Sequence, residues 1–70
     1  MKLSARNVFK GTVKTVTHGA VNSEVVIVLP GGLEVVSVIT KSSAESLGLK
    51  PGGEAYCIIK ATNVLIGVDE

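Results

Sequence analysis

The segment VVIVLPGGLEVVSVI, residues 25–39, predicts the architecture of the chain. Two runs rich in β-branched residues, which favour strands, flank a Pro-Gly-Gly turn at residues 30–32. We therefore expect a β-hairpin whose strands cover residues 21–29 and 33–39. The run VVIVLP has no polar member, which is typical of a strand that is buried on both faces.

One further strand is predicted before the hairpin. Residues 8–16, VFKGTVKTV, alternate imperfectly between two faces. One face is expected to carry Phe9, Gly11, Val13 and Thr15, and the other Lys10, Thr12 and Lys14. We expect a bend or a bulge at Gly11, because glycine inside a strand often marks one.

The pattern after the hairpin is that of a short helix. In TKSSAESLGLKPGG, residues 40–53, Ser42 and Glu45 have the spacing of a capping box at a helix start. Leu47 is expected to pack inward. Gly48 suits the position just after a helix, and the helix cannot continue through Pro51.

Two short apolar runs complete the chain, EAYCIIKA at residues 54–61 and NVLIGV at residues 63–68. Both are expected to be strands. The order of three strands, a helix and two strands predicts an all-β fold: a small five-stranded OB-like barrel with one short helix between strands 3 and 4. We expect a single domain over residues 1–70, because no repeat or linker interrupts them.

The composition indicates that the chain needs partners. A domain of 70 residues buries only about 60% of the surface that its unfolded chain exposes. A single cysteine, Cys57, and a single histidine, His18, cannot make a disulfide or a zinc site. Hydrophobic residues nevertheless make up 46% of the chain and the mean hydropathy is +0.48. We therefore expect a homo-oligomer, located in the cytoplasm and not in a membrane, with Cys57 reduced and buried.

Charge and residue types argue against two large classes of function. A net charge of +1 and only two aromatic residues, Phe9 and Tyr56, do not suit a groove for nucleic acid. Catalysis is not expected either, because His18 has no nucleophile or carboxylate at a suitable spacing and the acidic residues are scattered. For the same reason we expect no site at which side chains bind a metal cation directly.

Hydrogen-bond donors gather in three segments. Ser4 and Arg6 point to the same side of an extended segment, hydroxyls at residues 40–43 stand where the helix begins, and Lys60 interrupts an apolar run. Each has a simpler explanation as well: Ser42 as a helix cap, Lys60 as a side chain that reaches solvent at the barrel rim, and Arg6 as the partner of Asp69 or Glu70.

These segments resemble a known family. SARN at residues 4–7, ITKSSAESLGLKPG at 39–52 and IIKATNV at 58–64 resemble the Mop domain of molbindins, small molybdate-binding proteins related to TOBE domains and to the tail domain of molybdate-responsive regulators. The resemblance implies a homo-hexamer, a trimer of dimers, that binds molybdate or tungstate between subunits. It implies no organic cofactor.

The resemblance also implies two types of oxyanion site. The first takes its donors from the SARN segment, the helix start and the lysine step, which here are Ser4, Arg6, Thr40, Ser43, Lys60 and the backbone N–H of Ala61. The second uses backbone contacts of a loop, which here gives Gly19, Ala20 and Val21. No role is assigned to the neighbouring His18.

A cage of donors suits a tetrahedral dianion, whose four oxygens only accept hydrogen bonds. Arg6 and Lys60 would balance its two charges, and such a cage would disfavour protonated phosphate, which must donate a hydrogen bond. We expect that the segment from Ser4 onward reaches a neighbouring barrel. Intracellular storage of molybdate is the expected function. The alternatives are an OB-fold nucleic-acid-binding module and an oligomeric scaffold without a ligand.

Overall fold

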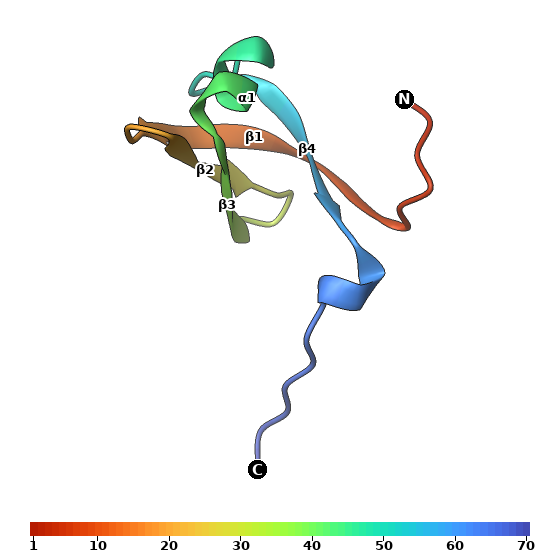
Figure 1. Cartoon of the computed structure of the whole chain (residues 1–70). Coiled ribbons are helices and arrows are strands. Elements are labelled where there is room, and N and C mark those ends of the chain that lie inside the picture. Colours follow the sequence, from red (N-terminus) through yellow and green to blue (C-terminus); the bar gives the residue numbers. More distant parts are fainter.

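The computed structural model describes all 70 residues and has one antiparallel sheet with a short helix at one end (Figure 1). The sheet has four strands in the order β3-β2-β1-β4. The elements are β1 (Asn7–His18), β2 (Asn22–Val28), β3 (Glu34–Thr40), helix α1 (Lys41–Ser46), β4 (Glu54–Ile59) and the 3-10 turn η1 (Ala61–Asn63). The sheet curls into a half-barrel, so the predicted all-β fold with a helix between the third and fourth strands is confirmed.

The predicted hairpin is the β2–β3 pair. Its turn is closed by the Leu29 N–H, which donates to the Leu33 carbonyl at 2.7 Å, and Gly31 and Gly32 supply the positive φ angles of 95° and 92°. The expectation that the first hairpin strand is buried on both faces is wrong. Burial alternates along β2, with Val25 buried and Glu24 exposed, because only the concave face of the single sheet is covered.

Strand β1 runs through both halves of the sheet. Its residues 7–12 pair with β4 and its residues 12–18 pair with β2, so the strand changes partner at Thr12. The register shifts between Val13 and Thr15, which places the bulge at Lys14 and not at Gly11. The extra residue turns Val16 toward the core in place of Thr15, contrary to the predicted face.

Glycine is required at position 11 because strand β2 lies too close to its Cα for a side chain to fit. A Cβ atom at this position would lie 2.6 Å from Ile27 Cγ2 and 2.7 Å from the Val28 carbonyl oxygen. We expect Gly11→Ala to lower the free energy of unfolding by about 1–3 kcal/mol, because the strands would have to separate. Urea denaturation measures this loss. Thr17→Ala, on the exposed part of the same strand, is the control, and equal midpoints for the two variants would contradict the prediction.

The N-cap of the helix is not the predicted residue, and the helix begins at Lys41. Thr40, not Ser42, is the N-cap: its extended backbone lets Thr40 Oγ1 accept from the Ser43 N–H at 3.1 Å. Leu47 is exposed, contrary to the prediction, because α1 ends before it; Ala44 and Leu49 contact the interior instead. Gly48, with φ 65°, ends the helix as predicted.

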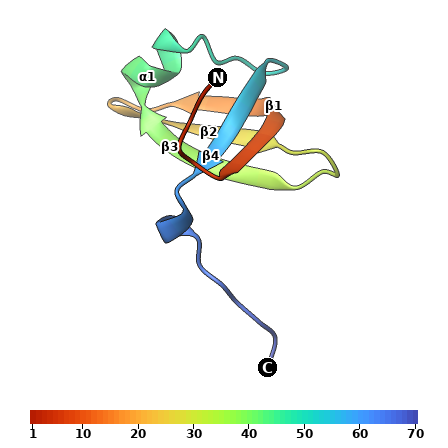
Figure 2. The same ribbon diagram turned by 90° about the vertical axis from the view of Figure 1, so that its right-hand side faces the viewer.

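The predicted fifth strand does not form within the chain. Residues 61–63 make η1, and residues 64–70 run away from the sheet in extended form without pairing (Figures 1 and 2). The physical reason is that a strand needs a neighbouring edge, and the direction in which η1 leaves β4 takes this tail away from both edges of its own sheet. The expectation of five strands in one chain is therefore wrong.

The core is small. Only seven of the 70 residues are buried, and Val13, Val25, Ile27 and Cys57 form the central cluster. Cys57 is a free, buried thiol, as predicted. Large apolar side chains are left in contact with solvent, most of all Leu65, Ile66 and Val68, which are 91%, 87% and 86% exposed. The single α-helix, six residues long, is too short to cross a membrane.

Candidate functional site

The two ends of the folded region meet in one open pocket of about 460 Å³. The β1–β4 ladder brings them together, since Asn7 pairs with Ile59 and its side-chain amide donates to the Ile59 carbonyl at 3.2 Å. The residues that precede Asn7 in the chain and those that follow Ile59 both line this pocket. The lining residues are Ser4, Ala5, Arg6, Ile58, Lys60, Ala61 and Thr62. Four of the six residues predicted for the first site therefore lie together.

The pocket carries positive charge without a compensating carboxylate. The two ion pairs of the structure lie elsewhere: Lys14 with Glu34 at 2.8 Å and Lys10 with Glu54 at 3.6 Å. Arg6 does not pair with Asp69 or Glu70, and Lys60 has no acidic partner. Both cations are thus free to bind an anion, and the hydroxyls of Ser4 and Thr62 can donate beside them.

The other two predicted donors, Thr40 and Ser43, lie at the helix start, where Ser43 lines a separate hollow and Thr40 does not. Ser42, Ser43, Ser46 and Leu47 line it. Thr40 Oγ1 donates to Ser43 Oγ at 2.7 Å, which leaves the Ser43 hydroxyl proton free to point outward. With this arrangement Thr40 orients Ser43, and the Ser43 hydroxyl is the donor that the hollow presents. The N–H groups of Lys41 and Ser43 are already bonded, to the Val21 carbonyl and to Thr40.

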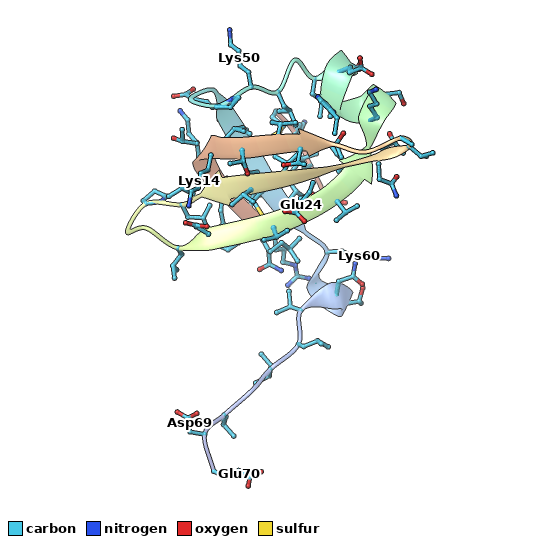
Figure 3. All side chains as sticks on the ribbon, turned by 90° about the vertical axis from the view of Figure 1, so that its left-hand side faces the viewer. Lys14, Glu24, Lys50, Lys60, Asp69 and Glu70 are labelled. Carbon is cyan, nitrogen blue, oxygen red and sulfur yellow. The ribbon has the colours of Figure 1, made fainter.

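The pocket and the hollow lie at opposite ends of the half-barrel. Figure 3 shows Lys60 and η1 below the sheet and α1 above it, and Figure 1 shows the same separation. No residue lines both. A single chain therefore carries two incomplete sets of donors that cannot surround one small anion.

The loop predicted for the second site connects β1 with β2. The Gly19 N–H is bonded to the Asn22 carbonyl at 2.7 Å, whereas the N–H groups of Ala20 and Val21 have no backbone partner. His18, just before this loop, lies 2.6 Å through its Nδ1 from the buried Ser23 hydroxyl. Of the three residues predicted to make backbone contacts, Ala20 and Val21 have an N–H group without a backbone partner.

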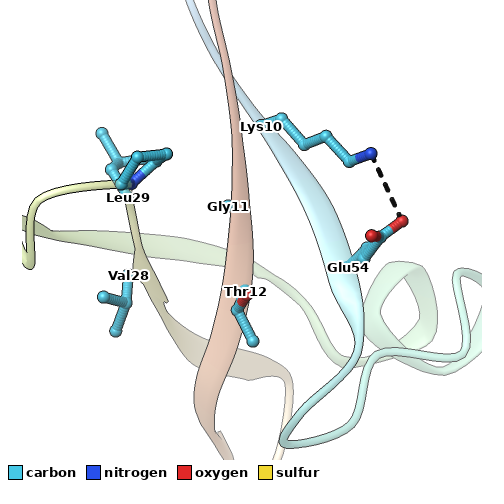
Figure 4. Close-up of a pocket in the computed structure, with 7 residues that line it drawn as sticks. Lys10, Gly11, Thr12, Val28, Leu29 and Glu54 are labelled. Atoms are coloured by element: carbon cyan, nitrogen blue, oxygen red, sulfur yellow. Dashed lines mark ion pairs between the residues drawn. The ribbon is translucent and has the colours of Figure 1, made fainter.

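Sequence reasoning missed Thr62, and it counted Ser42 among the hydroxyls at the helix start without assigning it to the site. Thr62 belongs to the same KAT step as Lys60, so its hydroxyl could have been included from that motif. Ser42 lines the helix hollow beside Ser43. Another groove, drawn in Figure 4, lies between β1 and the end of β2, but there Glu54 already neutralises Lys10, so it offers no comparable anion site.

Comparison with known proteins gives the family of the chain. The TOBE domain model matches residues 3–66. A probable molybdenum-pterin-binding protein of Haemophilus influenzae is 45% identical over 69 residues, covering 99% of this chain and all of the relative. Molybdenum-pterin-binding protein 3 of Clostridium pasteurianum is 47% identical over 66 residues, covering 94% of this chain and 97% of the relative. The chain belongs to the TOBE domain family, and within it to the molbindin, or Mop, type.

Solved structures give the same fold. MopII from Clostridium pasteurianum superposes with a TM-score of 0.91 at 40% identity, covering 96% of this chain and all of that one. The cytoplasmic molybdate-binding protein ModG, with molybdate bound, superposes with a TM-score of 0.94 at 54% identity, covering 99% of this chain and 49% of that one. The second structure is of a protein of the same fold that holds the oxyanion.

Proposed function

We propose that this protein binds molybdate, and tungstate with it, at sites between the subunits of a cytoplasmic homo-oligomer, and that it stores the oxyanion without catalysis. One observation carries the proposal. Residues 4–6, 58 and 60–62 form a pocket with two unpaired cations, hydroxyl donors and no carboxylate. The names of the relatives and the molybdate-bound neighbour support molybdate as the anion.

The charges suit a dianion. Arg6 and Lys60 together supply two positive charges to its two negative ones, and the Arg6 guanidinium can present two parallel N–H groups to two oxygens. A hydrogen bond between charged groups contributes about 1.5–3 kcal/mol. The pocket offers no carboxylate that would accept a hydrogen bond from protonated phosphate.

The site is completed by a second copy. The donors at α1 belong to the other end of the same half-barrel, so Ser43 of one copy would have to meet Arg6 and Lys60 of another. A hexamer built as a trimer of dimers would provide such contacts. The Ala20 and Val21 amides would form the second type of site in the same assembly.

The tail provides the means of assembly. Residues 64–68 are extended, apolar and exposed, while the outer edges of β3 and β4 have no neighbouring strand. An OB-like barrel closes with five strands. The tail of one copy would therefore add to the open sheet of another, which pairs the exposed edge and buries Leu65 and Ile66.

Isothermal titration of protein whose mass has been measured in solution tests this function. Molybdate and tungstate are expected to release heat of binding to an oligomer, and phosphate is expected to bind far more weakly. Single-stranded DNA is the control for the nucleic-acid alternative and is expected not to bind. A monomer, or an oligomer indifferent to both molybdate and tungstate, would refute the proposal.

A further inference from the structure

The tail leaves the sheet through a hinge of four residues. Strand β4 ends at Ile59 and the free segment begins at Val64, so only residues 60–63 set the direction of the tail. Two backbone hydrogen bonds hold this turn: Asn63 N–H to the Lys60 carbonyl at 2.8 Å and Val64 N–H to the Ala61 carbonyl at 3.3 Å. No residue of the turn is buried and no side chain caps it. A turn held so weakly opens readily.

The same hinge forms one wall of the anion pocket. Lys60, Ala61 and Thr62 line it together with Ser4 and Arg6, so the hinge contributes half of the side-chain donors, those of Lys60 and Thr62. The opposite wall is the N-terminal segment, which continues directly into β1 through Asn7. An anion that accepts hydrogen bonds from both walls would connect the hinge to the sheet by contacts that the free protein lacks.

In the proposed assembly, the tail of one copy pairs with the sheet of another, and it separates from that sheet by a rotation at residues 60–63. We propose that an oxyanion bound in this pocket locks the hinge and thereby slows the exchange of protomers between assemblies, so that loading with the anion fixes the assembly kinetically. This inference rests on the proposed function and concerns a regulation of the same site. It follows because a ligand that binds the closed hinge and not the open one lowers the population of the open hinge.

Native mass spectrometry of mixed isotopically labelled and unlabelled oligomers measures the exchange. Saturating molybdate is expected to slow the appearance of mixed assemblies by about tenfold or more, the factor that corresponds to one hydrogen bond to a charged group. At the same molybdate concentration Lys60→Ala is expected to show a smaller slowing than the parent, because the variant binds the anion more weakly and lacks the charged donor of the hinge. Lys50→Ala, a lysine outside the pocket, is expected to keep the full slowing.

Hydrogen exchange of the amides of residues 61–64 provides a second readout if the oligomers mix too slowly to follow. Molybdate is expected to slow exchange at these amides by a similar factor. Calorimetry first shows that the protein is loaded with molybdate. If protomer exchange is then unchanged, or amide exchange is unchanged where mixing is too slow to follow, the proposed lock is overturned and the proposed function stays intact. Absence of any binding heat overturns both.

Discussion

Replacing Leu65 and Ile66 together by aspartate is expected to convert the oligomer into monomers that no longer bind molybdate, although every donor side chain remains. These two side chains are 91% and 87% exposed in the single chain. Burying each in a partner would contribute about 1.5–3 kcal/mol, and a carboxylate at the same place would instead lose its hydration. Light scattering after size exclusion gives the mass, and calorimetry gives the binding.

The conservative double substitution Leu65→Met and Ile66→Val is the matched control. It keeps the tail apolar and is expected to preserve both the mass and the binding. Circular dichroism is expected to show a folded sheet in both variants, with a weaker strand signal in the aspartate variant, because its tail no longer pairs with another copy. An aspartate variant that keeps the mass of the parent would show that the subunits associate through another surface.

Arg6→Ala and Lys60→Ala are each expected to raise the Kd for molybdate by about 10- to 100-fold, which corresponds to the loss of one hydrogen bond between charged groups. Neither residue has an ion-pair partner within the chain, so stability and mass are expected to change little. The calorimetric Kd and the solution mass are measured on the same sample.

Two further variants sharpen this test. Arg6→Lys keeps the charge but removes the two parallel N–H groups, and it is expected to fall between the parent and Arg6→Ala. Lys50→Ala removes a positive charge outside the pocket and is expected to leave the Kd unchanged. If Arg6→Ala and Lys60→Ala bind as tightly as Lys50→Ala does, the anion lies elsewhere.

Local patterns predicted most of the fold. The hairpin, the position of the helix and the place of Gly48 depend on residues close in sequence, where turn chemistry and strand propensity act directly. The helix cap was misplaced because Thr40 and Ser42 are both good caps, and only the extended backbone at the end of β3 selects Thr40. The segment NVLIGV has the pattern of a strand, but its pairing depends on an edge that its own chain does not bring near.

The candidate site was predicted in part for a similar reason. Ser4, Arg6 and Lys60 meet because β1 and β4 pair in the register Asn7 to Ile59, which the spacing of the motifs alone does not reveal. Ser43 could not be placed relative to them, since the helix lies at the other end of the sheet. In the proposed site, the approach of donors from two copies would depend on the assembly and could not be predicted from the sequence of one chain.

The unpaired edges of the sheet affect how long a newly synthesised chain survives. A single chain exposes two strand edges and an apolar tail, which favour proteolysis and aggregation. If copies associate as proposed, covering these features is a bimolecular step whose rate rises with the concentration of the chain. We expect sparse expression to yield short-lived chains and abundant expression to yield durable ones.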